Sequence, residues 1–74
     1  MQTNNLIEEK VEKIISKVRN LRIQKEYSQE YVGDRLGIGQ VAYHKLENGK
    51  TKLKIGVLIK LALILEKEIS YFVE

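Results

Sequence analysis

The segment from Ser28 to Gly49 constrains the fold more than any other part of this sequence, because a glycine-containing turn divides it into two short helices. Ser28 is suited to cap the first helix, since its side-chain oxygen can accept a hydrogen bond from a free N–H of the first turn. Gly37 is suited to end it, because glycine adopts the left-handed conformation without steric cost. A second helix is predicted from Gln40 to about Asn48, with Gly39 as its cap.

Two short helices joined by such a turn form the helix-turn-helix arrangement, whose second helix enters the DNA major groove. Composition does not distinguish this arrangement from an ordinary helical hairpin, so the distinction rests on which residues occupy particular positions. Over residues 14–73 the sequence resembles the phage lambda repressor/Cro-type (XRE) family of DNA-binding domains. The residues that carry the resemblance are Leu21, Arg22, Ser28, Gln29, Glu30, Gly33, Leu36, Gly37, Ile38, Gln40, Tyr43, Leu46, Glu47, Asn48, Gly49 and Lys50.

The resemblance implies an all-α fold, a compact five-helix lambda-repressor-like bundle that forms a single domain over residues 1–74. Gly33 replaces the usual Ala of the family, and Gly39 replaces the usual Ser or Thr. The first helix is expected to begin near Asn4 or Asn5, so that residues 5–13 extend it beyond the family minimum. The fourth helix is expected from about Lys54 to Leu65, with Ile55 buried, and Ser70 is expected to cap a short final helix.

Composition excludes several classes of protein. The 74 residues include no Cys and a single His, so neither a disulfide framework nor the usual zinc site can form. No pair of groups is arranged for proton transfer, so we expect neither an enzyme nor a cofactor. A secretory signal is not expected, and the longest apolar run, Leu61 to Leu65, is too short to cross a bilayer. We expect a cytoplasmic protein associated with the bacterial nucleoid.

The positive charge is unevenly distributed. Residues 1–39 carry seven Lys or Arg and six Asp or Glu, residues 40–60 carry five and one, and residues 61–74 carry one and three. The net charges of the three segments are therefore +1, +4 and −2. Because the excess lies on the second helix of the motif and the loop after it, DNA phosphates are the expected partner.

Four residues of the second helix are candidates for contacts with DNA bases. Gln40 can hydrogen-bond adenine through its amide, and Val41 either contacts a thymine methyl group or packs locally. Lys45 is expected to contact guanine, with a phosphate contact as the alternative. His44 contacts a phosphate or base edge, or is simply solvated; it lacks the partners of a metal ligand.

The resemblance assigns roles to further residues. It places Gln29 directly behind Gln40, where it orients that amide and touches phosphate. It also pairs Arg22 with Glu47 in a structural ion pair between the first and third helices. Asn48, Lys50 and Lys52 follow the third helix and are expected to bind the sugar-phosphate backbone.

The sequence therefore predicts a sequence-specific double-stranded DNA-binding transcriptional regulator, a repressor that acts as a homodimer on a near-palindromic operator. The alternative is an antitoxin-like regulator that binds a second protein through the first-helix extension (residues 6–11) and the fourth helix. Neither role involves a membrane. The predicted dimer contacts are Val57, Leu63, Ile64, Tyr71 and Phe72.

Overall fold

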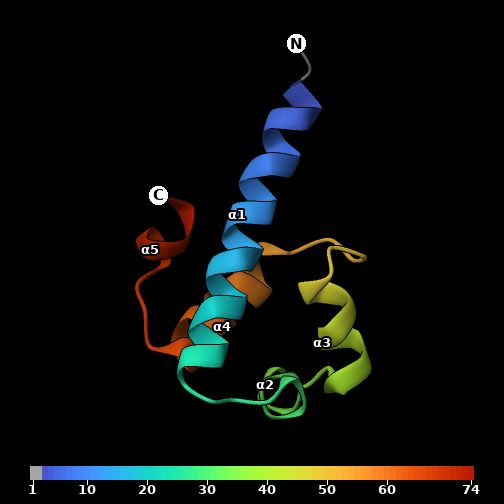
Figure 1. Ribbon diagram of the computed structural model, residues 1–74, viewed down its shortest axis with the longest axis vertical. Helices are drawn as coiled ribbons and strands as arrows, with labels where there is room; N and C mark the ends of the chain where they lie inside the picture. The colour runs from blue at the N-terminus through green and yellow to red at the C-terminus, as the bar shows by residue number, and fades with distance from the viewer. Residues whose placement is uncertain (1–2) are drawn as a thin grey trace.

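A computed structural model of the protein describes residues 3–74, and within this range the chain forms five α-helices and no strand (Figure 1). The expected all-α bundle is confirmed, although the predicted domain also includes residues 1 and 2, which lie outside the described range. None of the described helices is long and apolar enough to span a membrane. The helices are α1 (Thr3–Gln24), α2 (Gln29–Leu36), α3 (Gly39–Glu47), α4 (Ile55–Leu65) and α5 (Ile69–Val73).

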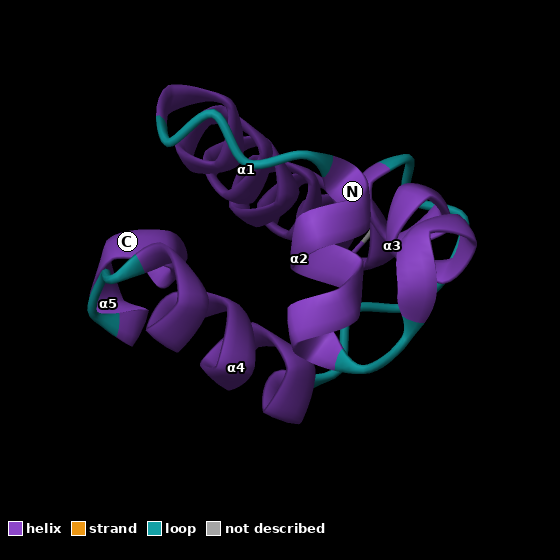
Figure 2. Cartoon of the chain, turned by 90° about the horizontal axis from the view of Figure 1, so that it is seen from below, coloured by secondary structure: helices purple, strands orange, loops and turns teal. Residues whose placement is uncertain are grey.

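One hydrophobic core joins all five helices. Helices α1 and α4 pack against each other and against α5, and α2 packs against α4. Helix α3 packs against α2 and α1 at one edge of the molecule (Figure 2). Burial of apolar side chains is the main source of stability in a chain that has no disulfide to constrain it. The buried apolar residues are Ile15, Val18, Leu21, Val32, Leu36, Tyr43, Leu46, Leu58, Leu61, Ala62, Leu65 and Phe72.

Both ends of α2 have the predicted geometry. The Ser28 hydroxyl accepts a hydrogen bond from the Tyr31 amide at 2.9 Å, and Gly37 has the left-handed φ of +80°. A Cβ atom on Gly33 would lie 2.3 Å from the Gly39 carbonyl oxygen, so the two helices meet where neither contact residue has a side chain. Gly39 itself has a φ of +83°. The two departures from the family pattern therefore occur at one contact between α2 and the start of α3.

Several helix boundaries differ from the predictions, including the start of α4 at Ile55 rather than Lys54 and the end of α3 at Glu47 rather than Asn48. The first helix already begins at Thr3, before the expected start near Asn4 or Asn5. The third helix begins at Gly39, one residue earlier than predicted, with no side-chain cap. Ser70 lies inside α5, whose cap position is Glu68, also without a side-chain hydrogen bond.

Ile55 was expected in the core, and this was wrong, because its side chain is 67% exposed. Its spacing from Leu58 fits the buried face, but Ile55 is the first residue of α4, where the neighbouring helices leave it uncovered.

The two halves of α1 have different surroundings. Val18 and Leu21 in the second half are buried in the core, whereas Leu6 and Ile7 in the first half are exposed. Figure 1 shows the first turns of α1 projecting past the other helices. The predicted extension is therefore helical, and part of its apolar surface has no partner within the described chain.

Candidate nucleic-acid interface

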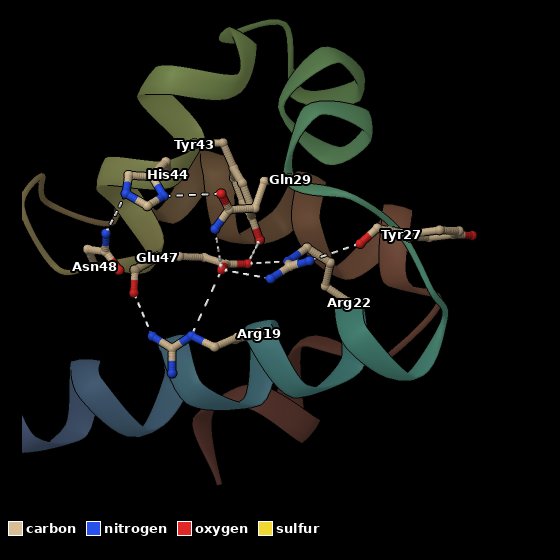
Figure 3. Close-up of polar contacts among 8 residues, drawn as sticks. All are labelled: Arg19, Arg22, Tyr27, Gln29, Tyr43, His44, Glu47 and Asn48. Atoms are coloured by element: carbon tan, nitrogen blue, oxygen red, sulfur yellow. Dashed lines mark hydrogen bonds and ion pairs between the residues drawn. The ribbon is translucent and has the colours of Figure 1, made fainter.

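Glu47, at the end of α3, is the one buried charged residue among those described, and only 2% of it is exposed. Arg22 of α1 donates from Nε to its Oε2 at 2.6 Å and from Nη2 to its Oε1 at 3.2 Å. The Tyr43 hydroxyl donates to Oε2, and the Gln29 amide donates from Nε2 to Oε1 at 3.0 Å (Figure 3). The ion pair that the resemblance implied is present, and the carboxylate has two further donors.

The hydrogen bonds to Glu47 decide its protonation state. Burial raises the pKa of this carboxyl group, but donors from Arg22, Tyr43 and Gln29 outweigh burial and hold its pKa below the ordinary value. The bond to Glu47 likewise raises the pKa of Arg22. Burial, followed by the bond to Glu47, raises the pKa of Tyr43 well above the usual value. At neutral pH the cluster therefore holds a carboxylate, a guanidinium and a neutral phenol.

Arg19 adds a second link between α1 and α3. Its Nη2 donates to the backbone oxygen of Glu47 at 2.6 Å, and its Nε lies 3.9 Å from the carboxylate Oε1. Arg22 also donates from Nη1 to the Tyr27 carbonyl at 2.9 Å, which ties down the loop before α2. Sequence reasoning missed this role of Arg19. The signal was available, since residues three apart on a helix share a face.

Gln29 connects the buried cluster to the exposed face of α3. Its Oε1 lies 3.1 Å from Nδ1 of His44, and Nε2 of His44 lies 2.9 Å from Nδ2 of Asn48. The expectation that Gln29 orients Gln40 was wrong, because both ends of its amide are bound to Glu47 and His44. His44 is correspondingly held on two sides, rather than being a lone solvated side chain.

The remaining candidate residues lie on the exposed side of α3 and on the loop that follows it. Gln40, Val41, His44 and Lys45 are all exposed, and Val41 has 71% of its surface in solvent. The apolar residues between them, Tyr43 and Leu46, are buried. The loop after α3 adds the exposed residues Asn48, Lys50 and Lys52. We call this polar, positively charged surface the α3 face; its amide and cationic side chains are of the kinds that hydrogen-bond base edges and phosphates.

The structure divides the predicted dimer contacts into three groups. Leu63 is 74% exposed, and Tyr71 is also exposed. Val57 and Ile64 are half-buried against the core. Phe72 was wrongly predicted as a contact, because it is 1% exposed and belongs to the core.

Sequence reasoning also missed two exposed residues of α4, Ile55 and Ile59. With Leu63 they recur every four residues and form one apolar strip, which we call the α4 strip.

Comparison with known proteins identifies the arrangement. Residues 18–72 match a family model described as helix-turn-helix. The match begins at residue 18, near the end of α1, and continues into α5, so it covers more than half of the chain. A search of curated proteins and a search of solved structures each found no match. Among the described residues, no group of three or more His, Asp or Glu side chains could hold a metal ion.

Proposed function

This chain belongs to the helix-turn-helix family of the XRE (lambda repressor/Cro-like) type, a family of DNA-binding transcriptional regulators, and we propose that it is a sequence-specific repressor. It acts as a homodimer on a near-palindromic operator, in the bacterial cytoplasm and at the nucleoid. Repression is steric: the bound dimer covers DNA that transcription requires, and no chemical step is involved.

The observation that carries this proposal is the contrast between the two sides of α3. Its inner side is fixed to α1 by Arg19, Arg22 and the buried carboxylate of Glu47. Its outer side presents polar side chains with no covering element. A rigid helix with an exposed face of amides and cations can enter the major groove without reordering, so little conformational entropy is lost on binding.

Each residue of the α3 face has a proposed role. Gln40 pairs with an adenine, Lys45 with a guanine O6 or N7, and Val41 packs on a thymine methyl group. The contacts with the DNA sugar-phosphate backbone come from side chains that precede or follow α3 in the chain. They are Gln29, Asn48, Lys50 and Lys52, and His44 acts at the boundary between base and phosphate contacts by holding the amide of Asn48.

The α4 strip is the proposed dimer interface. Ile55, Ile59 and Leu63 are exposed on α4, and Figure 2 shows α4 and α3 along different edges of the molecule. A second copy on α4 therefore leaves both α3 faces free. The two recognition helices would then enter successive major grooves about 34 Å apart.

Selection from a randomised duplex DNA pool at about 150 mM salt tests the proposal, because non-specific binding is weak there. Wild-type protein should enrich a two-fold motif whose half-sites are about one helical turn apart. A Gln40→Ala, Lys45→Ala variant should fold normally and lose the motif, since both side chains are exposed. If wild-type protein enriches no motif, the proposal is wrong.

A second candidate function is an antitoxin-like regulator that binds another protein. The observation in its favour is the exposed apolar surface at Leu6 and Ile7, which lies outside the matched residues 18–72. A protein partner that covers this surface should protect it from hydrogen exchange. Absence of any DNA motif together with such a partner would favour this function over the first.

A further inference from the structure

The ionised carboxylate of Glu47 dictates the orientation of the amide next to it. A carboxylate only accepts hydrogen bonds, so the group of Gln29 that faces it must be the NH₂ group. This is the observed contact, from Nε2 to Oε1 of Glu47 at 3.0 Å. The oxygen of the same amide then faces His44. The buried charge of Glu47 therefore determines which group of Gln29, its amide oxygen, faces the exposed side of α3.

The orientation of Gln29 in turn fixes the tautomer of His44. The amide oxygen only accepts, so Nδ1 of His44 must carry the proton that bridges their 3.1 Å separation. In the neutral imidazole Nε2 is then an acceptor. It faces Nδ2 of Asn48, a donor, at 2.9 Å. All three links have the same direction, from Asn48 through to Glu47.

We propose that Glu47 is a positioning residue for DNA binding: through Gln29 it holds His44 as the Nδ1–H tautomer and so fixes the amide of Asn48 on the α3 face. The inference rests on the proposed function, since it concerns the same DNA-contacting surface. Neutral His44 then has no free N–H, because Nδ1–H is bound to Gln29. Asn48 presents its oxygen and one remaining N–H to the ligand.

Protonation of His44 should reverse this pattern. A proton on Nε2 of His44 would place two hydrogen-bond donors against each other, since the NH₂ group of Asn48 faces it. The amide of Asn48 must then rotate by 180° so that its oxygen accepts from Nε2. Both N–H groups of Asn48 would then be free to donate to a phosphate, beside a new positive charge. The charged groups around His44 are Glu47 behind Gln29, Arg19 from α1 on the carbonyl of Glu47, and the adjacent Lys45. DNA affinity should therefore rise as the pH falls.

The first test measures the tautomer in the free protein, by long-range proton–nitrogen correlation of the imidazole at pH 8. The chain has one His, so the signal is unambiguous. The wild type should show a protonated Nδ1 and a bare Nε2. Gln29→Met breaks the link but leaves Arg22 on Glu47, and it should lose the Nδ1–H preference. Nε2–H in the wild type, or Nδ1–H retained in Gln29→Met, would overturn the proposal.

The second test measures affinity for the selected duplex between pH 8 and pH 6 at constant salt. The wild type should bind about three- to tenfold more tightly at pH 6, the change expected from one or two additional hydrogen bonds. The affinity of His44→Gln should be nearly independent of pH. Equal pH profiles for the two proteins would overturn the proposal.

The two proposals fail separately in these tests. Gln40→Ala should lose sequence-specific binding and keep the Nδ1–H tautomer of His44. The side chain of Gln40 takes no part in the hydrogen bonds that connect Asn48, His44, Gln29 and Glu47. If wild-type protein shows the tautomer but binds no specific DNA, the proposed function fails and the positioning of His44 stands as a structural fact only. If it binds DNA specifically with the other tautomer, the positioning role fails alone.

Discussion

Helices α3 and α4 are neighbours in the chain and both bury one side in the same core, but their exposed sides differ in kind. The exposed side of α3 is mainly polar, with an amide, an imidazole and a lysine beside Val41. That of α4 is mainly apolar, with Ile55, Ile59 and Leu63 beside Lys60. Helix α3 also buries a charge, and the described part of α4 buries none. This difference is the basis for the two proposed partners: a polar, hydrated ligand for α3, and an apolar protein surface for α4.

The two helices are also held in different ways. Helix α3 is attached to α1 by hydrogen bonds to Glu47, which fix its direction as well as its position. Helix α4 is held by apolar packing of Leu58, Leu61 and Leu65, which is less directional. A helix that must match base edges needs the more specific attachment. The predictions below test this contrast, from the largest expected effect to the smallest.

Glu47→Ala should cost about 3–5 kcal/mol of unfolding free energy, because it leaves Arg22 and the Tyr43 hydroxyl without their partner in the interior. That is a large part of the stability of a small domain. Urea unfolding followed by circular dichroism measures it. Glu9→Ala, at an exposed position of α1, is the control and should change stability by less than about 0.5 kcal/mol. Similar values for both variants would show that the cluster does not hold α3.

Two glycine substitutions should act in opposite directions. Gly33→Ala would place a Cβ 2.3 Å from the carbonyl of Gly39, so α2 and α3 must separate, at a cost of about 1–3 kcal/mol. Gly56→Ala on the outer side of α4 meets open space and should stabilise the helix by about 0.5–1 kcal/mol. Thermal unfolding of the two variants compares them directly. A neutral Gly33→Ala would mean that the contact between α2 and α3 adjusts freely.

Acid should destabilise the α3 attachment specifically. The pKa of Glu47 is lowered in the folded protein, so its contribution is complete above the unfolded-state value near 4.5 and is lost as pH falls through the lower folded value. Unfolding free energy should therefore drop more steeply below about pH 4.5 for the wild type than for Glu47→Gln. Parallel curves for the two proteins would contradict the assignment.

Leu63→Gln should weaken self-association about tenfold and change monomer stability by less than about 0.5 kcal/mol, because the side chain is exposed in the monomer. Sedimentation equilibrium measures the dimer constant. Lys60→Gln, also exposed on α4, is the matched control and should leave the constant nearly unchanged. An unaltered dimer in Leu63→Gln would place the interface elsewhere, and the exposed end of α1 would be tested next.

The smallest effect is expected at a single phosphate contact. Lys52→Ala should weaken binding to all duplexes by a similar factor and reduce the slope of log K against log salt by about 0.9. Lys67→Ala, outside the α3 face, should leave that slope unchanged. Titrations at three salt concentrations distinguish the two. A Lys52→Ala variant that alters sequence preference instead would mean that this lysine contacts bases.

Much of the fold follows from local rules. Ser28 and Gly37 define α2 through capping and left-handed geometry, and the structure agrees with both. Ile55 and Phe72 could not be placed by spacing alone. Both lie near the ends of helices, where burial depends on which neighbouring helix reaches them. Helical periodicity identifies a face, but only packing decides whether that face is covered.

Part of the candidate site could also be predicted from the sequence, from the family pattern and from the helical period. The pairing of Arg22 with Glu47 came from the family pattern, and exposed residues of α3 follow from its period. The position of Gln29 did not follow, because an amide with two possible partners takes the one that offers a buried charge. The sequence pattern predicted separate DNA contacts for His44 and Asn48. Their spacing of four residues also brings their side chains into contact with each other.

Chemical-shift mapping with the selected duplex tests the central claim most directly, since it compares α3 and α4 in one experiment. Amide signals of residues 29, 40–48 and 50–52 should move on addition of DNA. Signals of Ile55, Ile59 and Leu63 should depend on protein concentration instead, because these residues form the proposed dimer interface. Large DNA-induced shifts on α4 with none on α3 would contradict the account.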